Sequence, residues 1–304
     1  MTDQFPTDPP VSAPLTQIQI DQRVFDLYDE YCHGRLDRRA FLQQAAIVVA
    51  GGLAMAQALL PRYAQAQTIS FTDPRIKATY ETYPSPGGTS GTMRGYLVQP
   101  TGPGPFPIVL VIHENRGLNP YIEDVARRAA TEGFLALAPD GLFPVGGYPG
   151  NDDDGRRLQS GLDQGKLRTD MARSARFLKA HPLSNGKLGV TGFCWGGSTT
   201  NYLAATLGAD ILAAVPYYGA PAETAAVSRI QAAIQGHLAA NDQRINAMWP
   251  AYEAALKAAG ATHEVHTYPG TQHGFHNNST PRYDEAAAKL AWDRTIAFFR
   301  THLG

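Results

Sequence analysis

A cysteine lies between glycines in the segment TGFCWGGS, residues 191–198, at a position where many hydrolases carry a serine. Gly192 and Gly196 flank Cys194 as a sharp turn from a strand into a helix requires, because larger side chains would collide there. The N-terminus of a helix favours a thiolate, the form of cysteine that attacks carbonyl groups. A free cysteine is otherwise commonly a buried apolar side chain. The segment therefore leaves two interpretations of Cys194, a nucleophile or a packed thiol.

Two further residues complete a possible triad. Asp242 and His273 each follow a predicted strand, and the order Cys194, Asp242, His273 is the order nucleophile, acid, histidine of the α/β-hydrolase triad. Residues that follow parallel strands meet at one edge of the sheet. We therefore expect His273 to be the base and Asp242 to orient it. His276 is an alternative base, whereas His266 lies inside a predicted strand.

A glutamate follows the first long apolar segment, in the loop that usually completes an oxyanion hole. Glu114 can hold the thiol proton in the resting protein and release it when substrate arrives. The alternative is a structural ion pair with Arg116 or Arg94 that fixes the loop. The backbone N–H groups of Asn115 and Trp195 are the expected oxyanion donors.

The elements that position these residues alternate between strands and helices from about residue 75 onward. Residues 107–114 form a continuous apolar segment typical of a strand buried on both faces. The pattern predicts an α/β fold with a mostly parallel sheet flanked by helices. Strands are predicted over 76–85, 92–100, 107–114, 133–140, 186–193, 211–219, 231–240 and 262–270, helices over 120–131, 163–180, 194–208, 243–259 and 280–302, and a long polar loop over 141–156.

Composition narrows the class of partner. The chain has 304 residues, a formal net charge of −1 and 43% hydrophobic residues, enough for one large domain plus an extension. This charge balance gives no basic surface for nucleic acid or an anionic membrane. We expect a small-molecule substrate, no metal or cofactor, and a monomer or homodimer, with residues 67–304 as the catalytic domain.

Residues 1–66 form an extension of different character. Arg38 and Arg39 precede Phe41 and Leu42, and an apolar segment over 45–60 leads to a small-x-small sequence at 64–66. This order resembles a twin-arginine export signal, and the apolar segment is too short to span a membrane. We expect a periplasmic or secreted protein. The alternative is a cytoplasmic protein that keeps residues 21–60 as two helices packed on the domain or on a partner.

Export would also remove one of the two cysteines. Cys32 would leave with the extension, so the mature chain would hold Cys194 alone and could form no internal disulfide. A single thiol in an oxidising compartment is expected to be buried or used.

The chain from about residue 76 resembles the dienelactone hydrolase family of α/β-hydrolases. The resemblance rests on the motifs HENRG, GFCWGG, NDQRI and HGFH, which lie at residues 113–117, 192–197, 241–245 and 273–276. It implies that Cys194 attacks a lactone carbonyl, that Asp242 and His273 are its acid and base, and that Glu114 holds the resting thiol. It also implies a thioester-type acyl-enzyme and no metal or cofactor.

One position departs from the family pattern. Asn277 stands where the characterised dienelactone enzymes carry an arginine for the substrate carboxylate, and an amide does not replace bidentate binding by a guanidinium. The resemblance therefore does not fix dienelactone as the substrate. Four arginines can compensate for the missing arginine from loops: Arg116, Arg156, Arg157 and Arg282. Alternatively, four aromatic residues can line a more apolar pocket: Trp195, Phe275, Tyr148 and Tyr218.

These observations predict a hydrolase of a lactone or small carboxylic ester, with Arg116, Phe275 and Tyr148 as substrate-binding residues. A general esterase or thioesterase with the same triad is the first alternative. A non-catalytic binding or thiol-redox protein on the same scaffold is the second, because a fold does not fix a function.

Overall fold

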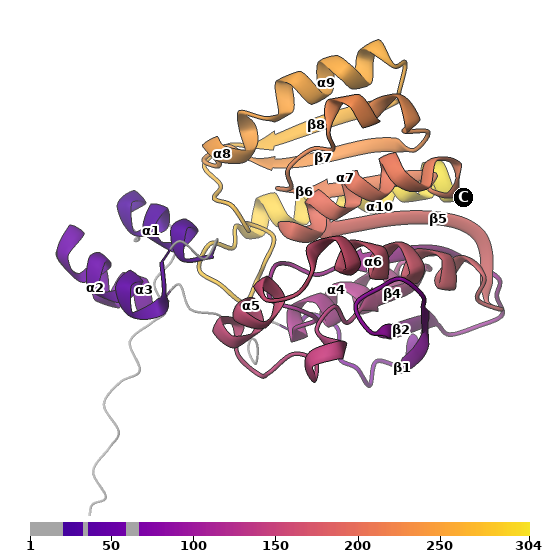
Figure 1. Ribbon diagram of the computed structural model, residues 1–304, viewed down its shortest axis with the longest axis horizontal. Coiled ribbons are helices and arrows are strands. Elements are labelled where there is room, and N and C mark those ends of the chain that lie inside the picture. The colour runs from indigo at the N-terminus through magenta and orange to yellow at the C-terminus, as the bar shows by residue number, and fades with distance from the viewer. Residues whose placement is uncertain (1–20, 33–35, 59–66) are drawn as a thin grey trace, which may run out of the picture. The chain divides into compact units, whose positions relative to one another are not determined.

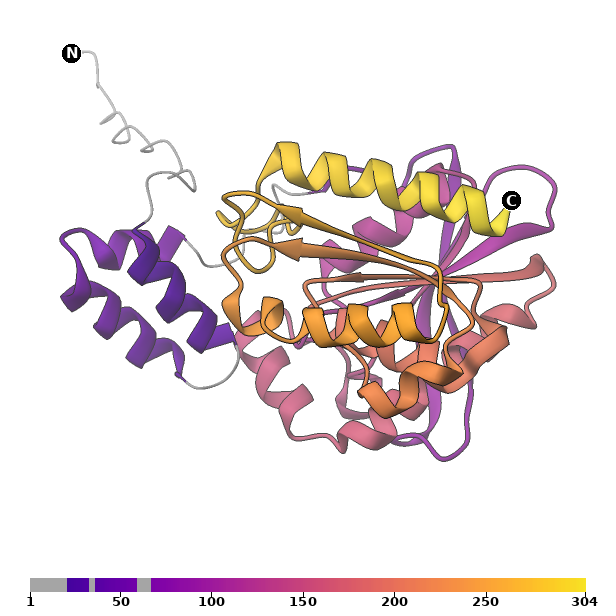
Figure 2. The same ribbon diagram turned by 90° about the horizontal axis from the view of Figure 1, so that it is seen from above.

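The computed structural model describes residues 21–32, 36–58 and 67–304 (Figures 1 and 2). The chain divides into two compact units near residue 60. The predicted domain boundary at residue 66 and the small-x-small sequence at 64–66 lie outside the described residues. No helix in the described ranges is both long enough and apolar enough to cross a membrane.

The second unit is built on one sheet of eight strands in the order β1-β2-β4-β3-β5-β6-β7-β8. β1 and β2 pair antiparallel, β2 pairs antiparallel with β4, and the remaining neighbours pair parallel. The strands are β1 (Ile76–Ser85), β2 (Gly91–Pro100), β3 (Phe106–Ile112), β4 (Leu135–Pro139), β5 (Ser184–Phe193), β6 (Ala213–Tyr217), β7 (Ala233–Ala239) and β8 (His263–Tyr268). The predicted α/β-hydrolase architecture is confirmed.

Helices cover both faces of this sheet. They are α4 (Pro120–Thr131), α5 (Asp152–Ser160), α6 (Gln164–Lys179), α7 (Trp195–Leu207), α8 (Gln243–Asn246), α9 (Trp249–Ala258) and α10 (Glu285–Leu303), with short 3-10 turns at Phe143–Val145, Gly208–Asp210 and Thr224–Arg229. Val109 and Val111 of β3 pack in one apolar cluster with α4 and α10, and Ile108 and Leu110 pack in another with α6, α7 and α9. Figure 2 shows α10 and α9 on opposite faces of the strands. A strand buried on both faces explains the continuous apolar sequence.

Three sequence predictions for this unit are wrong in detail. Residues 152–156 of the predicted loop belong to α5 (Asp152–Ser160), because the Asn151 side chain accepts from the Asp154 N–H and caps a helix with an acidic first turn. The predicted helix over 243–259 is two helices, since Pro250 belongs to the first turn of α9 and would break a continuous helix. The last helix begins at Glu285 rather than at Thr280, because Asp284 is the residue that caps it.

The first unit contains three helices, α1 (Gln22–Cys32), α2 (Arg38–Val48) and α3 (Gly52–Ala58). They share a small core of Val24, Phe25, Tyr28, Tyr31, Phe41, Ala45 and Ala56, in which the rings of Tyr31 and Phe41 stack at 5.2 Å. The Asp37 side chain caps α2 by accepting from the Ala40 N–H at 2.7 Å. The described part of residues 21–60 is therefore helical, as the alternative interpretation expects, but it forms three helices rather than two.

Candidate active site

The turn between β5 and α7 has Cys194 as its central residue. Cys194 has φ 56° and ψ −111°, a conformation that residues with a side chain rarely adopt. Its backbone N–H donates to the Tyr217 carbonyl oxygen at 3.1 Å, which ties the turn to the end of β6. The side chain is partly exposed at the N-terminus of α7. The strained turn thus places the thiol at the start of α7, where it is partly exposed and partly packed against the core.

Glycines allow the backbone to pass through this turn. A Cβ atom on Gly192 would lie 2.3 Å from the carbonyl oxygen of Gly196. A Cβ atom on Gly196 would lie 2.3 Å from the carbonyl oxygen of Ile112, and one on Gly197 would lie 2.4 Å from another backbone oxygen. Each of these neighbours is main chain, which cannot rotate away as a side chain can. The glycine bracket is therefore a steric requirement of the turn.

We expect Gly196→Ala to lower the free energy of unfolding by about 1–3 kcal/mol, the usual cost of forcing a group into a filled site. Urea denaturation with and without the substitution measures this difference. Gly161→Ala is the matched control, because its Cβ would be 3.4 Å from the nearest atom and its φ is −78°. Equal midpoints for Gly196→Ala and the original protein would contradict the close approach of α7 to the end of β3.

Asp242 and His273 meet at the edge of the sheet where the parallel strands end. Asp242 follows β7 and His273 follows β8, and His273 Nδ1 lies 2.5 Å from Asp242 Oδ2. Asp242 also caps α8, because its Oδ1 accepts from the Ile245 N–H at 3.2 Å. Burial raises the pKa of Asp242, but the charge and hydrogen bond of His273, the Ile245 N–H and the charge of Arg244 together outweigh burial, so the pKa is lowered. The carboxylate is therefore held ionised beside the imidazole.

The imidazole of His273 also interacts with Cys194. Burial lowers the pKa of His273, but the charge of Asp242 and the charge and hydrogen bonding of Cys194 together raise it well above its ordinary value. The ring of Tyr218 packs beside it, with centroids 5.0 Å apart. Tyr218 is fully buried and has φ 35°, so it is a second strained residue at this site. The structure thus brings Cys194, His273 and Asp242 together.

Glu114 lies on the loop after β3 and is 1% exposed. Burial raises the pKa of Glu114 and so does the charge of Cys194, against the nearby guanidinium groups of Arg116 and Arg282. Its Oε2 accepts from Asn277 Nδ2 at 3.0 Å. The residue that departs from the family pattern is therefore a direct partner of the glutamate.

The two arginines weighed as ion-pair partners of Glu114 form close ion pairs elsewhere. Arg116 Nη1 lies 2.6 Å from Asp152 on α5, and Arg94 Nη2 lies 2.5 Å from Asp140. Neither pair was predicted, because Asp152 and Asp140 carry no motif that identifies their partners. The Glu114 carboxyl is thus held by an amide and influenced by guanidinium groups at longer range.

The loop after β3 also lies against the start of α7, as an oxyanion hole requires. The ring of His113 stacks on that of Trp195 with centroids 5.4 Å apart and planes 14° apart. Asn115 follows in this loop, and Trp195 is the first residue of α7. Their backbone N–H groups belong to segments that touch at Gly196.

The predicted substrate-binding residues have different environments. Tyr148 is partly exposed and donates to Asp152 Oδ1 at 2.9 Å, so it shares a carboxylate with Arg116. Arg116 is 5% exposed. Phe275 is 0% exposed and packs among Tyr217, Tyr218 and Tyr268, so it belongs to the core behind the site.

The two alternative histidines have other partners. His276 Nδ1 lies 2.7 Å from the Tyr121 hydroxyl, and burial lowers its pKa well below the ordinary value. His266 is a residue of β8 with its Nε2 3.7 Å from Glu264. The sequence did not predict that Tyr121 is the hydrogen-bond partner of His276. Its place in the first turn of the helix after β3 is the signal that could have suggested it. Within the described ranges, no group of three or more His, Cys, Asp or Glu side chains is arranged to hold a metal ion.

Known proteins resemble this chain over most of its length. The profile described as "Dienelactone hydrolase family" matches residues 93–303, and one described as "YqhI-like" matches residues 13–50. A "Putative carboxymethylenebutenolidase" of Escherichia coli (strain K12) is 32% identical over 248 residues, which cover 76% of this chain and 90% of that protein. The "Putative hydrolase fragment YghX" of the same organism is 62% identical over 112 residues, which cover 36% of this chain and 95% of that protein.

A solved structure supports the same assignment. The crystal structure of a "Putative Dienelactone Hydrolase" from Klebsiella pneumoniae subsp. pneumoniae superposes with a TM-score of 0.63 and 30% sequence identity, covering 73% of this chain and 99% of that chain. Residues 93–303, which the family profile matches, include strands β3 to β8, the strained cysteine turn and the histidine–aspartate pair. The chain therefore belongs to the dienelactone hydrolase family, a family of hydrolases with the α/β-hydrolase fold.

Proposed function

We propose that this protein hydrolyses a lactone or a small carboxylic ester, with Cys194 as nucleophile, His273 as base and Asp242 as the orienting acid. The observation that carries this proposal is the 2.5 Å contact between His273 Nδ1 and Asp242 Oδ2, on an imidazole that also interacts with Cys194. Covalent catalysis needs a nucleophile in contact with a base, and the base in contact with an acid that orients it.

The reaction proceeds in two halves. His273 takes the proton of the Cys194 thiol, and the sulfur adds to the carbonyl carbon. The C–O bond to the leaving oxygen then breaks and His273 passes that proton to the oxygen, which leaves a thioester on Cys194 and a neutral imidazole. In a lactone the leaving oxygen stays attached to the acyl chain because the ring opens. Water then gives a proton to His273 and attacks the thioester carbon, the C–S bond breaks, and a carboxylic acid is released that ionises in solution.

Two other groups support these steps. In the resting protein, Glu114 and Cys194 share one proton, because burial raises the pKa of the carboxyl and the charge of Cys194 raises it further. Substrate that displaces this pairing leaves the proton with the thiol, from which His273 then removes it. The N–H groups of Asn115 and Trp195 stabilise the oxyanion at the N-terminus of α7.

The pairing of polar groups supports an uncharged substrate. The Asn277 amide is already bound to Glu114, and the Arg116 guanidinium is held by Asp152. Neither group is set to take the substrate carboxylate that a dienelactone carries. The name carboxymethylenebutenolidase of the Escherichia coli relative supports a lactone. A general esterase or thioesterase is the alternative, and a binding or thiol-redox protein is the less favoured one.

A substrate panel with acyl-enzyme trapping tests this proposal. We expect simple lactones and activated aryl esters to be hydrolysed, and rapid acid quenching to show by intact mass one acyl group per chain. Peptide mapping is expected to place this group on Cys194. Turnover without any acylated intermediate would contradict the covalent route, and no turnover of any lactone, ester or thioester would favour the binding or redox alternative.

Asn277→Asp tests the link between Glu114 and the thiol. The substitution keeps the acceptor for the Ser279 N–H, which lies 3.0 Å from Asn277 Oδ1, but sets a carboxylate against Glu114. Like-charge repulsion raises the pKa of Glu114 further, so the pH–rate profile shifts and kcat/KM falls by roughly tenfold, a value typical of one lost positioning hydrogen bond. Asn185→Asp, on the exposed start of β5, is the control. An unchanged pH–rate profile would show that Asn277 does not act on Glu114.

We also propose that the protein is exported and that residues 1–66 are its signal. The order of arginine pair, apolar segment and small residues supports export. The alternative, a retained helical extension in a cytoplasmic protein, is supported by the packed core around Phe41 and by the match of residues 13–50 to a profile of their own.

N-terminal sequencing of the protein from fractionated cells separates the two cases. Export predicts a mature chain in the periplasm or medium that begins after Ala66, and cytoplasmic retention when Arg38 and Arg39 are both replaced by lysine. Arg23→Lys, in α1, is the control and leaves export unchanged. Cytoplasmic protein that begins at Met1 would overturn the export proposal.

A further inference from the structure

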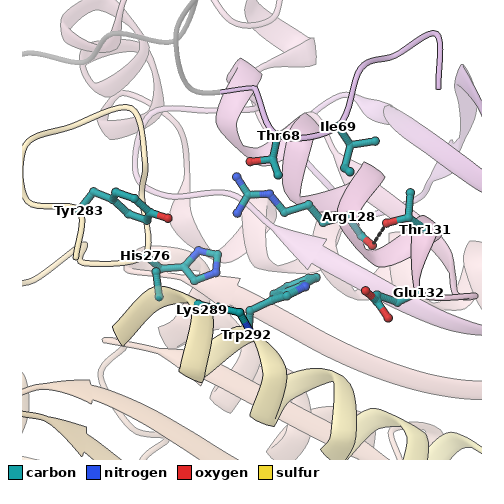
Figure 3. A pocket seen from close by; sticks show the side chains of 10 residues that line it. Thr68, Ile69, Arg128, Thr131, Glu132, His276, Tyr283, Lys289 and Trp292 are labelled. Carbon is teal, nitrogen blue, oxygen red and sulfur yellow. Dashed lines mark hydrogen bonds between the residues drawn. The ribbon is translucent and has the colours of Figure 1, made fainter. Parts of the chain in front are cut away.

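A cavity lies on the face of the sheet covered by α4 and α10 (Figure 3). Its volume is about 240 Å³, and its lining includes Arg128 of α4, Trp292 of α10, and His276, Tyr283 and Thr68 from connecting segments. None of the four proposed catalytic side chains lines it. A cavity somewhat below the roughly 300–1,000 Å³ of drug-sized pockets suits a small ligand.

His276 carries the first observation that points to a ligand. Its side chain is 1% exposed, and its Nδ1 lies 2.7 Å from the Tyr121 hydroxyl. Its Nε2 is buried, and the part of the chain that the structure describes supplies no hydrogen-bond partner for that atom. A buried polar atom without a partner costs about 1–3 kcal/mol, so a partner from outside the protein is expected to supply the bond.

The kind of partner follows from the state of the ring. Burial and the positive charge of Arg128 lower the pKa of His276, so the imidazole is neutral and has one N–H donor and one acceptor. When the Tyr121 hydroxyl donates to Nδ1, the proton of the imidazole is on Nε2, which then donates into the cavity. The ligand atom at Nε2 is in that case an acceptor.

Arg128, like His276, offers hydrogen-bond donors at this end of the cavity. Its Nε donates to Asp124 Oδ2 at 2.7 Å and its Nη2 lies 2.6 Å from the same oxygen, so one edge of the guanidinium is fixed. Figure 3 shows the guanidinium reaching toward the space between Thr68, Tyr283 and His276. A guanidinium has five N–H donors, and its other edge suits an anionic oxygen.

The remaining lining combines apolar and polar side chains. The Trp292 ring lies 5.9 Å from the His276 ring, and Ile69 and Ala288 contribute further apolar surface. The other charged side chains of the lining are paired, since Glu132 lies 2.7 Å from Arg300 and Lys289 lies 2.5 Å from Asp293. Arg128 is paired as well, with Asp124, but through one edge of its guanidinium, so the other edge and His276 Nε2 are the donors that a ligand would meet.

We propose that this cavity is a binding site for a small carboxylate with a planar apolar body. The carboxylate accepts from His276 Nε2 and Arg128, and the body of the ligand packs on Trp292. The site is distinct from the Cys194 site and does not depend on the activity proposed for it, although a hydrolase of carboxylic esters releases carboxylates of this class.

Isothermal titration with benzoate tests the site. We expect one molecule of benzoate to bind per chain with a Kd on the order of 1 mM or lower, and His276→Phe to raise this Kd by at least about tenfold, because phenylalanine keeps the ring but removes the donor. His302→Phe, near the end of α10, is the matched control and leaves the Kd unchanged. The same titration after alkylation of Cys194 by iodoacetamide separates this site from the active site.

Each outcome decides the proposal. Binding that survives alkylation and is lost in His276→Phe supports it. Binding that alkylation removes and His276→Phe preserves would assign benzoate to the active site and overturn the proposal, as would no saturable binding. If His276→Phe does not fold, as judged by circular dichroism, Trp292→Leu replaces it, and an unchanged Kd in that variant would equally overturn the proposal.

Discussion

Replacing Cys194 by alanine is expected to lower kcat/KM for an activated aryl ester or lactone on the order of 10⁴-fold or more, the loss seen when the nucleophile of a triad is removed. The size of the effect follows from the geometry. The φ of 56° at the β5–α7 turn is tolerated because it directs a side chain outward at the N-terminus of a helix. Alanine fits the same turn and removes only the sulfur.

Three comparisons make this result specific to the thiol. Cys194→Ser keeps an attacking oxygen beside His273 and is expected to retain more activity than Cys194→Ala. The double substitution with His273→Ala is expected to be no worse than Cys194→Ala, because members of one catalytic unit are strongly non-additive. Thermal unfolding of each variant controls for folding. Activity of Cys194→Ala near that of the original protein would refute the covalent mechanism.

The sequence predicts the strands well because they are buried on both faces. An uninterrupted series of apolar residues as short as 107–112 is typical of a central strand in a parallel sheet, and β3 forms at Phe106–Ile112. Helix ends were less predictable, because several residues compete to cap them. Thr280 and Asp284 are both good caps by type, and only packing selects Asp284.

The residues of the candidate site also divide into those that the sequence could identify and those that it could not. Cys194, Asp242 and His273 could be identified because each follows a strand, and the ends of parallel strands converge whatever the loops between them do. The Asn277–Glu114 bond joins residues 163 positions apart through loops, and no periodicity reports such a contact. Phe275 shows the opposite case. It was predicted to bind substrate because it lies near His273, but an aromatic residue at that place can equally pack into the core, and its side chain is fully buried.

Asp242→Asn is expected to lower kcat on the order of 10³–10⁴-fold, although the side chain keeps its size, because the amide selects the wrong tautomer of the catalytic histidine. The helix cap fixes this orientation. Oδ1 of residue 242 accepts from the Ile245 N–H, so the amide NH₂ of asparagine would face His273 Nδ1. That nitrogen must then accept a hydrogen bond, and the proton on Nε2 would point at the Cys194 sulfur that the base should deprotonate.

Asp284→Asn is the matched control for Asp242→Asn. Asp284 caps α10 in the same way, by accepting from the Ala287 N–H at 2.9 Å, and it lies outside the proposed catalytic group. Both variants are expected to keep the cap and fold, and only Asp242→Asn is expected to lose activity. Equal activities would show that the His273–Asp242 contact does not select the tautomer.

The same substitution changes how stability depends on pH. In the folded protein the pKa of His273 is raised, so its contribution is complete below the unfolded value of about 6.5 and is lost as pH rises through the folded pKa. The pKa of Asp242 is lowered, so its contribution is present above about 3.9 and is lost as pH falls through the folded pKa. The two conditions overlap between about pH 3.9 and 6.5.

Urea denaturation across that range therefore gives the largest difference in unfolding free energy between the original protein and Asp242→Asn. In Asp242→Asn, burial acts on His273 without the opposing carboxylate, so the pKa of the imidazole falls below its level in the original protein. The alkylation rate of Cys194 against pH reports this change, because the imidazolium that stabilises the thiolate is lost at a lower pH. A stability difference that grows steadily above pH 6.5 would instead show that Asp242 acts on a group other than His273.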